Sequence, residues 1–151
     1  MPPKQYKLAS QADTQKLAVL LASKLAPPMV IGFSGTLGAG KTTFIRSMLR
    51  ALGVAGPIKS PTYAWVETYP LKGFDFHHFD LYRLSEQTAL ESLGFRDYFI
   101  EDTICCIEWP ERALGLRRHL DMLLSFTLKD GQRSLKIQAI EPSAQNIIKI
   151  L

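Results

Sequence analysis

Short apolar stretches and alternating apolar and polar positions recur along the 151 residues of this chain. Short runs rich in β-branched and aromatic side chains are typical of strands. On this basis we predict strands over residues 4–8, 29–33, 63–69, 74–79, 104–107, 123–128 and 134–140. Because the run 104–107 is wholly apolar, it indicates a strand that is buried on both faces.

Apolar positions spaced three and four residues apart predict helices between several of these strands. The pattern indicates a helix over residues 11–25, which Ser10 would cap and Pro27-Pro28 would end. Another helix would run to Leu52, with Gly53 as its terminator. We further predict short helices over residues 85–93, from Pro110, and in the tail from Ser143.

Turn signals predict two antiparallel strand pairs. Gly73 separates the strands 63–69 and 74–79, and Asp130-Gly131 separates the last two strands with a dipeptide typical of hairpins. Strands that alternate with helices predict an α/β sheet. The expected fold class is therefore α/β: a three-layer α/β/α arrangement with a mixed sheet, β-hairpin additions and helices on both faces.

Composition favours one globular domain over residues 1–151. Hydrophobic residues make up 46% and charged residues 21% of the chain. No apolar run approaches the roughly 20 residues that a membrane-spanning helix needs. Since the start of the chain, Met1 to Gln5, also lacks the apolar segment of a signal peptide, we expect a cytoplasmic protein without membrane contact.

Neither the net charge nor the two cysteines predict a specific binding or redox site. The formal net charge is +4, but no run of Lys and Arg is longer than Arg117-Arg118, so charge alone does not predict nucleic-acid binding. Cys105 and Cys106 form neither a C-x-x-C pair nor a zinc-site spacing. Neighbouring strand residues point to opposite faces of a sheet. Because the run 104–107 is expected to be buried on both faces, both cysteines are expected to be buried as small apolar side chains.

Residues 35–42 read Gly-Thr-Leu-Gly-Ala-Gly-Lys-Thr, which matches the phosphate-binding pattern G-x-x-x-x-G-K-[ST] between a predicted strand and a predicted helix. Glycines allow the backbone N–H groups to point inward at a helix N-terminus, which attracts anions. Lys41 would reach the β- and γ-phosphates, and the Thr42 hydroxyl would bind Mg²⁺. The loop predicts a nucleotide-binding protein with a P-loop NTPase-like fold. The residues expected around the phosphates are Gly35, Thr36, Leu37, Gly38, Ala39, Gly40, Lys41, Thr42 and Thr43.

Two acidic residues follow predicted strands and are candidates for the magnesium site. Asp80 follows residues 74–79, and Glu108 follows the apolar run 104–107. Carboxylates at the carboxyl ends of parallel strands lie beside the ligand crevice of an open α/β sheet. Because the second run fits a central strand better, we assign Glu108 to the metal, directly or through water. Asp80 is assigned to the surroundings of the metal or to the attacking water.

Several other residues have both a functional and a structural interpretation. Thr62, in Lys59-Ser60-Pro61-Thr62-Tyr63, could sense the γ-phosphate as the first switch of GTPases does, although an ordinary turn explains the same segment equally well. Trp109 is by default a core residue. His77 and His78 fall on opposite faces of a strand, which favours structural roles for both.

Five segments occur in an order that resembles one protein family. They are residues 35–43, Lys-Ser-Pro-Thr-Tyr at 59–63, His-Phe-Asp-Leu-Tyr-Arg at 78–83, Gly-Phe-Arg-Asp-Tyr-Phe at 94–99 and Ile-Glu-Trp-Pro-Glu at 107–111. Together they resemble the TsaE (YjeE) family of small bacterial P-loop ATPases, over roughly residues 10–128.

The resemblance implies binding and hydrolysis of ATP to ADP with Mg²⁺, in the synthesis of N6-threonylcarbamoyladenosine (t6A) in tRNA. It also implies that the ATPase acts with a TsaB–TsaD heterodimer, so that its role on tRNA is indirect. The intrinsic activity would be low and stimulated by these protein partners.

The resemblance also implies roles for individual residues. By it, Thr43 lies at the α-phosphate, Thr62 is the switch threonine and Trp109 has a functional role. Asp80 and Glu108 match the essential acidic residues, with Glu108 at the metal. The segment Ser10 to Thr14, including Gln11, would close over the adenine.

Three other functions stay open. A small-molecule kinase would share the phosphate loop and could use Arg117-Arg118 in a lid, although the chain is short for a lid and an acceptor site. A GTP-dependent switch would need an N-K-x-D motif, which the sequence does not contain. A binding module with a purely structural nucleotide would show no activity that Lys41→Ala or Glu108→Ala could remove.

Overall fold

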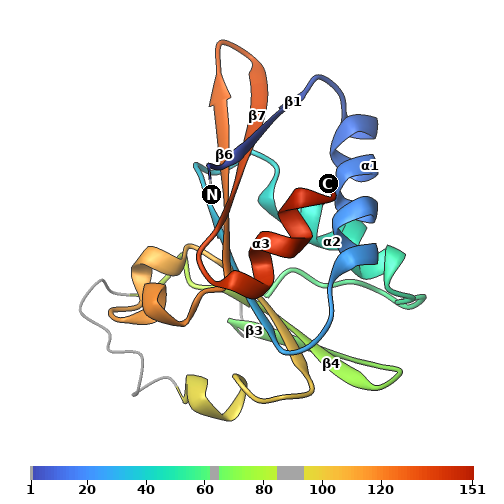
Figure 1. The fold of residues 1–151 in the computed structure, drawn as a ribbon, viewed down its shortest axis with the longest axis vertical. Helices are drawn as coiled ribbons and strands as arrows, with labels where there is room; N and C mark the ends of the chain where they lie inside the picture. The colour runs from blue at the N-terminus through green and yellow to red at the C-terminus, as the bar shows by residue number, and fades with distance from the viewer. Residues whose placement is uncertain (1, 62–64, 85–93) are drawn as a thin grey trace.

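A seven-stranded sheet forms the centre of the computed structural model, which describes residues 2–61, 65–84 and 94–151 (Figure 1). Its strands are β1 (Lys4–Leu8), β2 (Met29–Ser34), β3 (Val66–Leu71), β4 (Phe74–Asp80), β5 (Thr103–Glu108), β6 (Met122–Lys129) and β7 (Gln132–Ala139). Their order across the sheet is β1-β7-β6-β2-β5-β4-β3.

The central strands β6, β2, β5 and β4 are parallel, whereas β1, β7 and β3 pair antiparallel at the two sides. This mixed sheet with hairpin additions confirms the predicted α/β fold class. Because β2, β5 and β4 run in the same direction, their carboxyl ends meet at one edge of the sheet. Open α/β sheets bind their ligands at that edge.

Side chains of the central strands alternate between two apolar cores. In β2, Phe33 faces one core and Val30 the other, and in β5 Cys106 and Cys105 divide in the same way. Both cysteines are free and buried, as predicted. Since burial raises the pKa of the Cys105 thiol to about 12, this thiol stays protonated at neutral pH.

Three α-helices of the described ranges contribute to the larger core on one side of the sheet (Figure 1). They are α1 (Gln11–Lys24), α2 (Lys41–Ala51) and α3 (Pro142–Lys149). Ser10 caps α1 as predicted, because its hydroxyl accepts the N–H of Asp13 at 3.1 Å. In the part of the chain that is described, no helix is both long and apolar enough to cross a bilayer.

Three short 3₁₀ segments are described: η2 (Phe95–Asp97), η3 (Pro110–Arg112) and η4 (Leu116–His119). η2 and η4 contribute to the smaller core, and η3 lies between two residues that do. The helix predicted from Pro110 begins at that residue, but it is a three-residue 3₁₀ segment and not an α-helix. It ends because the backbone of Ala113 is extended (φ −109°, ψ 116°), and Gly115 then adopts a left-handed conformation (φ 87°). The helix predicted over residues 85–93 lies outside the described residues.

Both predicted antiparallel pairs are confirmed. Asp130 and Gly131 have positive φ angles of 53° and 74°, as a two-residue hairpin with matching twist requires. β3 and β4 pair across Gly73, whose φ is 90°. The described part of the strand predicted over 63–69 begins at Val66, and residues 62–64 lie outside the described ranges.

Phe44 anchors α2 to the sheet, with ring centroids 5.9 Å from Phe33 and 5.5 Å from Phe126. Because the side chain is fully buried, we expect Phe44→Ala to lower the free energy of unfolding by about 3–5 kcal/mol, measured by urea denaturation. Leu114→Ala, at a side chain that is 69% exposed, is the control and should change it by less than about 0.5 kcal/mol. A loss below about 1 kcal/mol for Phe44→Ala would contradict this packing.

Candidate functional site

The loop between β2 and α2 has the backbone conformation that its glycines permit. Gly35, Gly38 and Gly40 have φ angles of 136°, 79° and 109°. A Cβ at Gly35 would lie 2.5 Å from the carbonyl oxygen of Phe126, so that position has no room for a side chain. Gly40 is the N-cap of α2 and caps it with no side chain, which leaves the first N–H groups of this helix for a ligand.

Lys41, at the start of α2, is buried against the loop. Its ammonium donates to the carbonyl oxygen of Gly35 and lies 3.9 Å from the centroid of the Trp109 ring. Burial lowers the pKa of Lys41, and the nearby Glu108, Glu111 and Asp80 carboxylates oppose that shift. The cation is thus held by a carbonyl and an aromatic face, two weak partners that an anion would outcompete.

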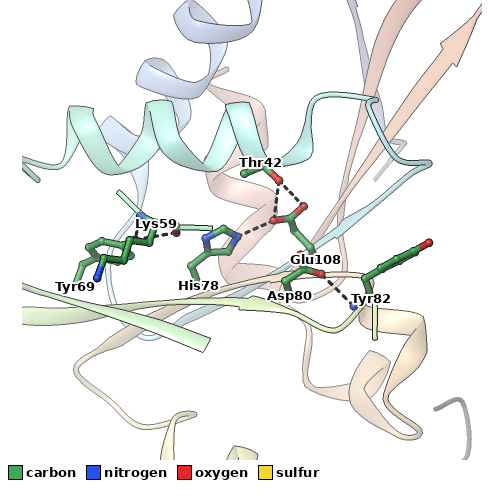
Figure 2. Close-up of polar contacts among 7 residues, drawn as sticks. All are labelled: Thr42, Lys59, Tyr69, His78, Asp80, Tyr82 and Glu108. Carbon is green, nitrogen blue, oxygen red and sulfur yellow. Dashed lines mark hydrogen bonds and ion pairs between the residues drawn. The ribbon is translucent and has the colours of Figure 1, made fainter. Parts of the chain in front are cut away.

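Glu108, at the carboxyl end of β5, accepts hydrogen bonds from two other elements (Figure 2). The Thr42 hydroxyl of α2 lies 3.0 Å from Oε1 and 3.1 Å from Oε2. His78 Nε2 of β4 lies 2.7 Å from Oε2. The prediction that Glu108 ends a central buried strand is confirmed, since all of β5 is buried between β2 and β4.

Asp80 ends β4 directly beside Glu108 in the strand register. Its Oδ1 accepts the N–H of Tyr82 at 3.0 Å (Figure 2). Burial raises the pKa of Asp80, and the Glu108 carboxylate raises it further, whereas the Tyr82 N–H, His78 and Lys41 lower it. Ionising this carboxyl therefore costs free energy in the folded protein.

A cavity of about 670 Å³ lies over these groups. It is lined by Gln11, Thr14, Leu37, Gly38, Gly40, Lys41, Thr42, Thr43, Ser60, Asp80, Tyr82, Arg83, Glu108, Trp109 and Arg133. Phosphate-loop residues lie on one side and the two carboxylates on another. Such a cavity, with a few converging polar groups, is typical of a small-molecule site.

Trp109 lines the cavity next to Lys41. Its ring centroid lies 5.1 Å from that of Tyr82, and the Arg112 guanidinium lies 5.6 Å from the Trp109 centroid. The left-handed backbone of Trp109 turns the chain directly after Glu108. Trp109 therefore belongs both to the edge of the smaller core and to the cavity wall.

The segment before Thr62 is hydrogen-bonded to β3. The Tyr69 hydroxyl accepts the Lys59 N–H at 3.1 Å and lies 3.3 Å from the Lys59 carbonyl oxygen, to which it donates (Figure 2). Ser60 then lines the cavity. Thr62, the predicted switch threonine, lies outside the described residues.

The oxygen atoms that line the cavity suit a magnesium ion that binds together with a phosphate ligand. The described residues include no group of three or more His, Cys, Asp and Glu side chains placed to hold a metal ion. Mg²⁺ typically binds through one or two carboxylates together with phosphate oxygens and water. The Thr42 hydroxyl and the Glu108 carboxylate, in contact with each other, form such an incomplete set of oxygen ligands.

Comparison with known proteins decides the family. The family model described as "Threonylcarbamoyl adenosine biosynthesis protein TsaE" matches residues 8–137. This chain belongs to the TsaE family. Proteins of this family are involved in the synthesis of t6A in tRNA. The resemblance inferred from the sequence motifs is therefore confirmed.

Individual TsaE relatives match over most of the chain. A Haemophilus influenzae protein named tRNA threonylcarbamoyladenosine biosynthesis protein TsaE is 42% identical over 130 residues, covering 86% of this chain and 82% of that protein. An Aquifex aeolicus protein of the same name is 36% identical, with coverage of 89% and 95%. A crystal structure of Bacillus subtilis YdiB superposes with a TM-score of 0.80 and 22% identity, covering 99% of this chain and 95% of that one, which supports the fold.

Most residues that the sequence predicted for the site are brought together. Of the predicted set, the cavity lining contains Gln11, Leu37, Gly38, Gly40, Lys41, Thr42, Thr43, Asp80, Glu108 and Trp109. Gly35, Thr36 and Ala39 shape the loop without lining the cavity. Arg117 and Arg118, the lid candidates of the kinase alternative, lie in η4 and are not among its lining residues.

The structure adds two residues to the predicted set at this TsaE site. Arg133 of β7 lines the cavity and donates to the carbonyl oxygen of Gly38 at 3.2 Å. No sequence motif points to Arg133. It reaches the site because β7 pairs with β1, which places Arg133 opposite Leu8, just before α1. His78, for which the sequence favours a structural role, lies two residues before Asp80 and therefore on the face of β4 toward Glu108. His77 does face away, and its Nδ1 lies 2.8 Å from the Thr68 hydroxyl.

Asp80→Asn should stabilise the folded protein at neutral pH. A carboxyl whose pKa is raised on folding binds its proton more tightly in the folded state, so folding stability falls as pH rises from the unfolded pKa, near 4, through the folded pKa. The amide keeps an oxygen for the Tyr82 N–H but carries no charge. Urea denaturation should show a stability advantage of Asp80→Asn that grows between about pH 4.5 and pH 7. Asp75→Asn, at an exposed aspartate of the same strand, should show no such trend. An Asp80→Asn protein that is less stable at pH 7 would contradict the assignment.

Proposed function

We propose that this protein binds ATP with Mg²⁺ and hydrolyses it within t6A synthesis. The observation that carries the proposal is the hydrogen bond from Thr42 to Glu108. It joins the helix start that would bind phosphates to the strand end that would bind the metal. Membership of the TsaE family supports this pathway over other P-loop functions.

The phosphates would lie along the loop from Gly38 to Thr43. The N–H groups at the start of α2 would donate to them, and the Lys41 ammonium would leave the Gly35 carbonyl for the β- and γ-phosphate oxygens. Because Lys41 is buried, its charge would be little screened by water and would interact strongly with the phosphates.

Thr42 and Glu108 would hold the Mg²⁺ ion, Glu108 directly or through a water molecule. The ion would neutralise negative charge on the β- and γ-phosphate oxygens. Asp80, beside Glu108, would orient the attacking water and accept its proton. Since burial raises the pKa of Asp80, its carboxylate is a stronger base than an exposed one.

The adenine would lie at the other end of the cavity, near Gln11 and Thr14 of α1. Arg133 lies there too, against Gly38, and its planar guanidinium could stack on a base. Trp109 would close the opposite side beside Lys41. Thr62 would sense the γ-phosphate. It follows Lys59, whose backbone is hydrogen-bonded to Tyr69.

Hydrolysis would be slow in the isolated protein and faster in a complex with TsaB–TsaD-like partners. A partner would supply a further cation at the γ-phosphate. The role on tRNA would then be indirect, through the partners. The cytoplasm, where tRNA is modified, would be the place of action.

Turnover of ATP by the purified protein, alone and with TsaB–TsaD-like partners, tests the function. We expect slow turnover alone and strong stimulation by the partners. Lys41→Ala should reduce the stimulated rate by at least about 10²-fold, because it removes a donor to the developing charge. No stimulation, with turnover only after a small acceptor is added, would instead indicate a kinase.

Glu108→Gln separates metal binding from phosphate binding. The amide keeps one oxygen for the Thr42 hydroxyl but loses the charge that Mg²⁺ requires. Mg²⁺-dependent turnover should fall, while ADP binding without Mg²⁺, measured by calorimetry, should remain. Loss of all nucleotide binding in this variant would count against the role of Glu108.

A further inference from the structure

His78 contacts Glu108 from within the sheet. His78 Nε2 lies 2.7 Å from Glu108 Oε2, and the two residues are 1% and 2% exposed (Figure 2). β4 and β5 are parallel neighbours in which Cys106 pairs with His78 and Glu108 pairs with Asp80. Both partners thus lie on regular strands, so the contact is fixed by the register of the sheet.

The position of the shared proton follows from the chemistry of the partners. The Thr42 hydroxyl lies 3.0 Å from Oε1 and 3.1 Å from Oε2 and has a single proton to donate. A carboxylate that binds a metal is deprotonated and can only accept hydrogen bonds. The proton between Nε2 and Oε2 therefore belongs to His78. Its other nitrogen, Nδ1, is buried and has no hydrogen-bond partner among the described residues. A bare lone pair at Nδ1 is tolerated more readily there than an orphaned N–H group.

These donors fix the rotation of the Glu108 carboxylate. Thr42 approaches from α2, with one hydroxyl proton shared between Oε1 and Oε2, and His78 approaches Oε2 from β4. Without His78, one of these donors would be lost inside the sheet, and the carboxylate would be held only by a hydroxyl that must also bind the metal. Partners that orient a metal-binding carboxylate typically contribute about 10–100-fold to metal affinity.

We propose that His78 is a positioning residue that presents the Glu108 carboxylate to Mg²⁺ by donating its Nε2–H to Oε2. This inference rests on the proposed function, because it assumes that Glu108 serves the metal of a bound nucleotide. His78 touches neither metal nor nucleotide in this role. Its effect passes entirely through Glu108.

The tautomer of His78 can be tested without metal or nucleotide. In the ¹⁵N NMR spectrum of the free protein we expect the proton on Nε2 and a bare Nδ1. Glu108→Gln should shift the Nε2 resonance, and His77, on the other face of β4, should not respond. A His78 ring with its only proton on Nδ1 would overturn the proposal, because Nε2 could not then donate.

The effect on the metal can be measured by calorimetric titration of ADP with and without Mg²⁺. His78→Leu should reduce the Mg²⁺-dependent gain in affinity by about 10–100-fold and leave binding without Mg²⁺ unchanged. His78→Gln, whose amide N–H can replace Nε2–H, should recover most of the gain. His77→Gln is the matched control and should behave as the wild type.

The outcomes distinguish this inference from the proposed function. A wild-type protein whose ADP affinity gains nothing from Mg²⁺ would defeat both. A normal gain in the wild type and an equal gain in His78→Leu would defeat only the role of His78. If His78→Leu does not fold, the tautomer and the response to Glu108→Gln in the NMR experiment decide the question.

Discussion

The hydrogen bonds that the Glu108 carboxylate accepts join three elements at one point. Thr42 brings the start of α2, His78 brings β4, and Glu108 itself ends β5. A buried carboxylate is tolerated only where donors replace its water, and these two side chains supply them. The phosphate loop therefore lies against the strand ends because a buried charge is satisfied there.

Two other charges at this site are buried at a cost. Burial lowers the pKa of Lys41 and raises the pKa of Asp80, so each shift favours the neutral form. A phosphate beside Lys41 and a cation beside the carboxylates would oppose both shifts. The charged forms of Lys41 and Asp80 are therefore less stable in the free protein than they would be beside a ligand group of opposite charge. Shifted pKa values of this kind are common at functional sites.

Local patterns in the sequence predicted the strands, the two antiparallel pairs and the phosphate loop, because each depends on neighbouring residues. Glycines with positive φ define the loop, and Asp130-Gly131 defines a hairpin. The short length of η3 was not predictable, since it depends on the extended backbone of Ala113. Arg133 reaches the site through strand pairing between distant segments, which no local pattern encodes. The spacing of His78 from Asp80 sets its face of β4, but its contact with Glu108 depends on the pairing of β4 with β5.

In the proposed function, a nucleotide and Mg²⁺ share the crevice between α2 and the ends of β4 and β5. A crystal structure with a non-hydrolysable ATP analogue and Mn²⁺ in place of Mg²⁺ tests it most directly, because anomalous scattering locates the manganese. We predict a manganese peak at the Thr42 hydroxyl on the side of Glu108, with phosphates along Gly38 to Lys41. Manganese or phosphates bound away from these residues would contradict the claim.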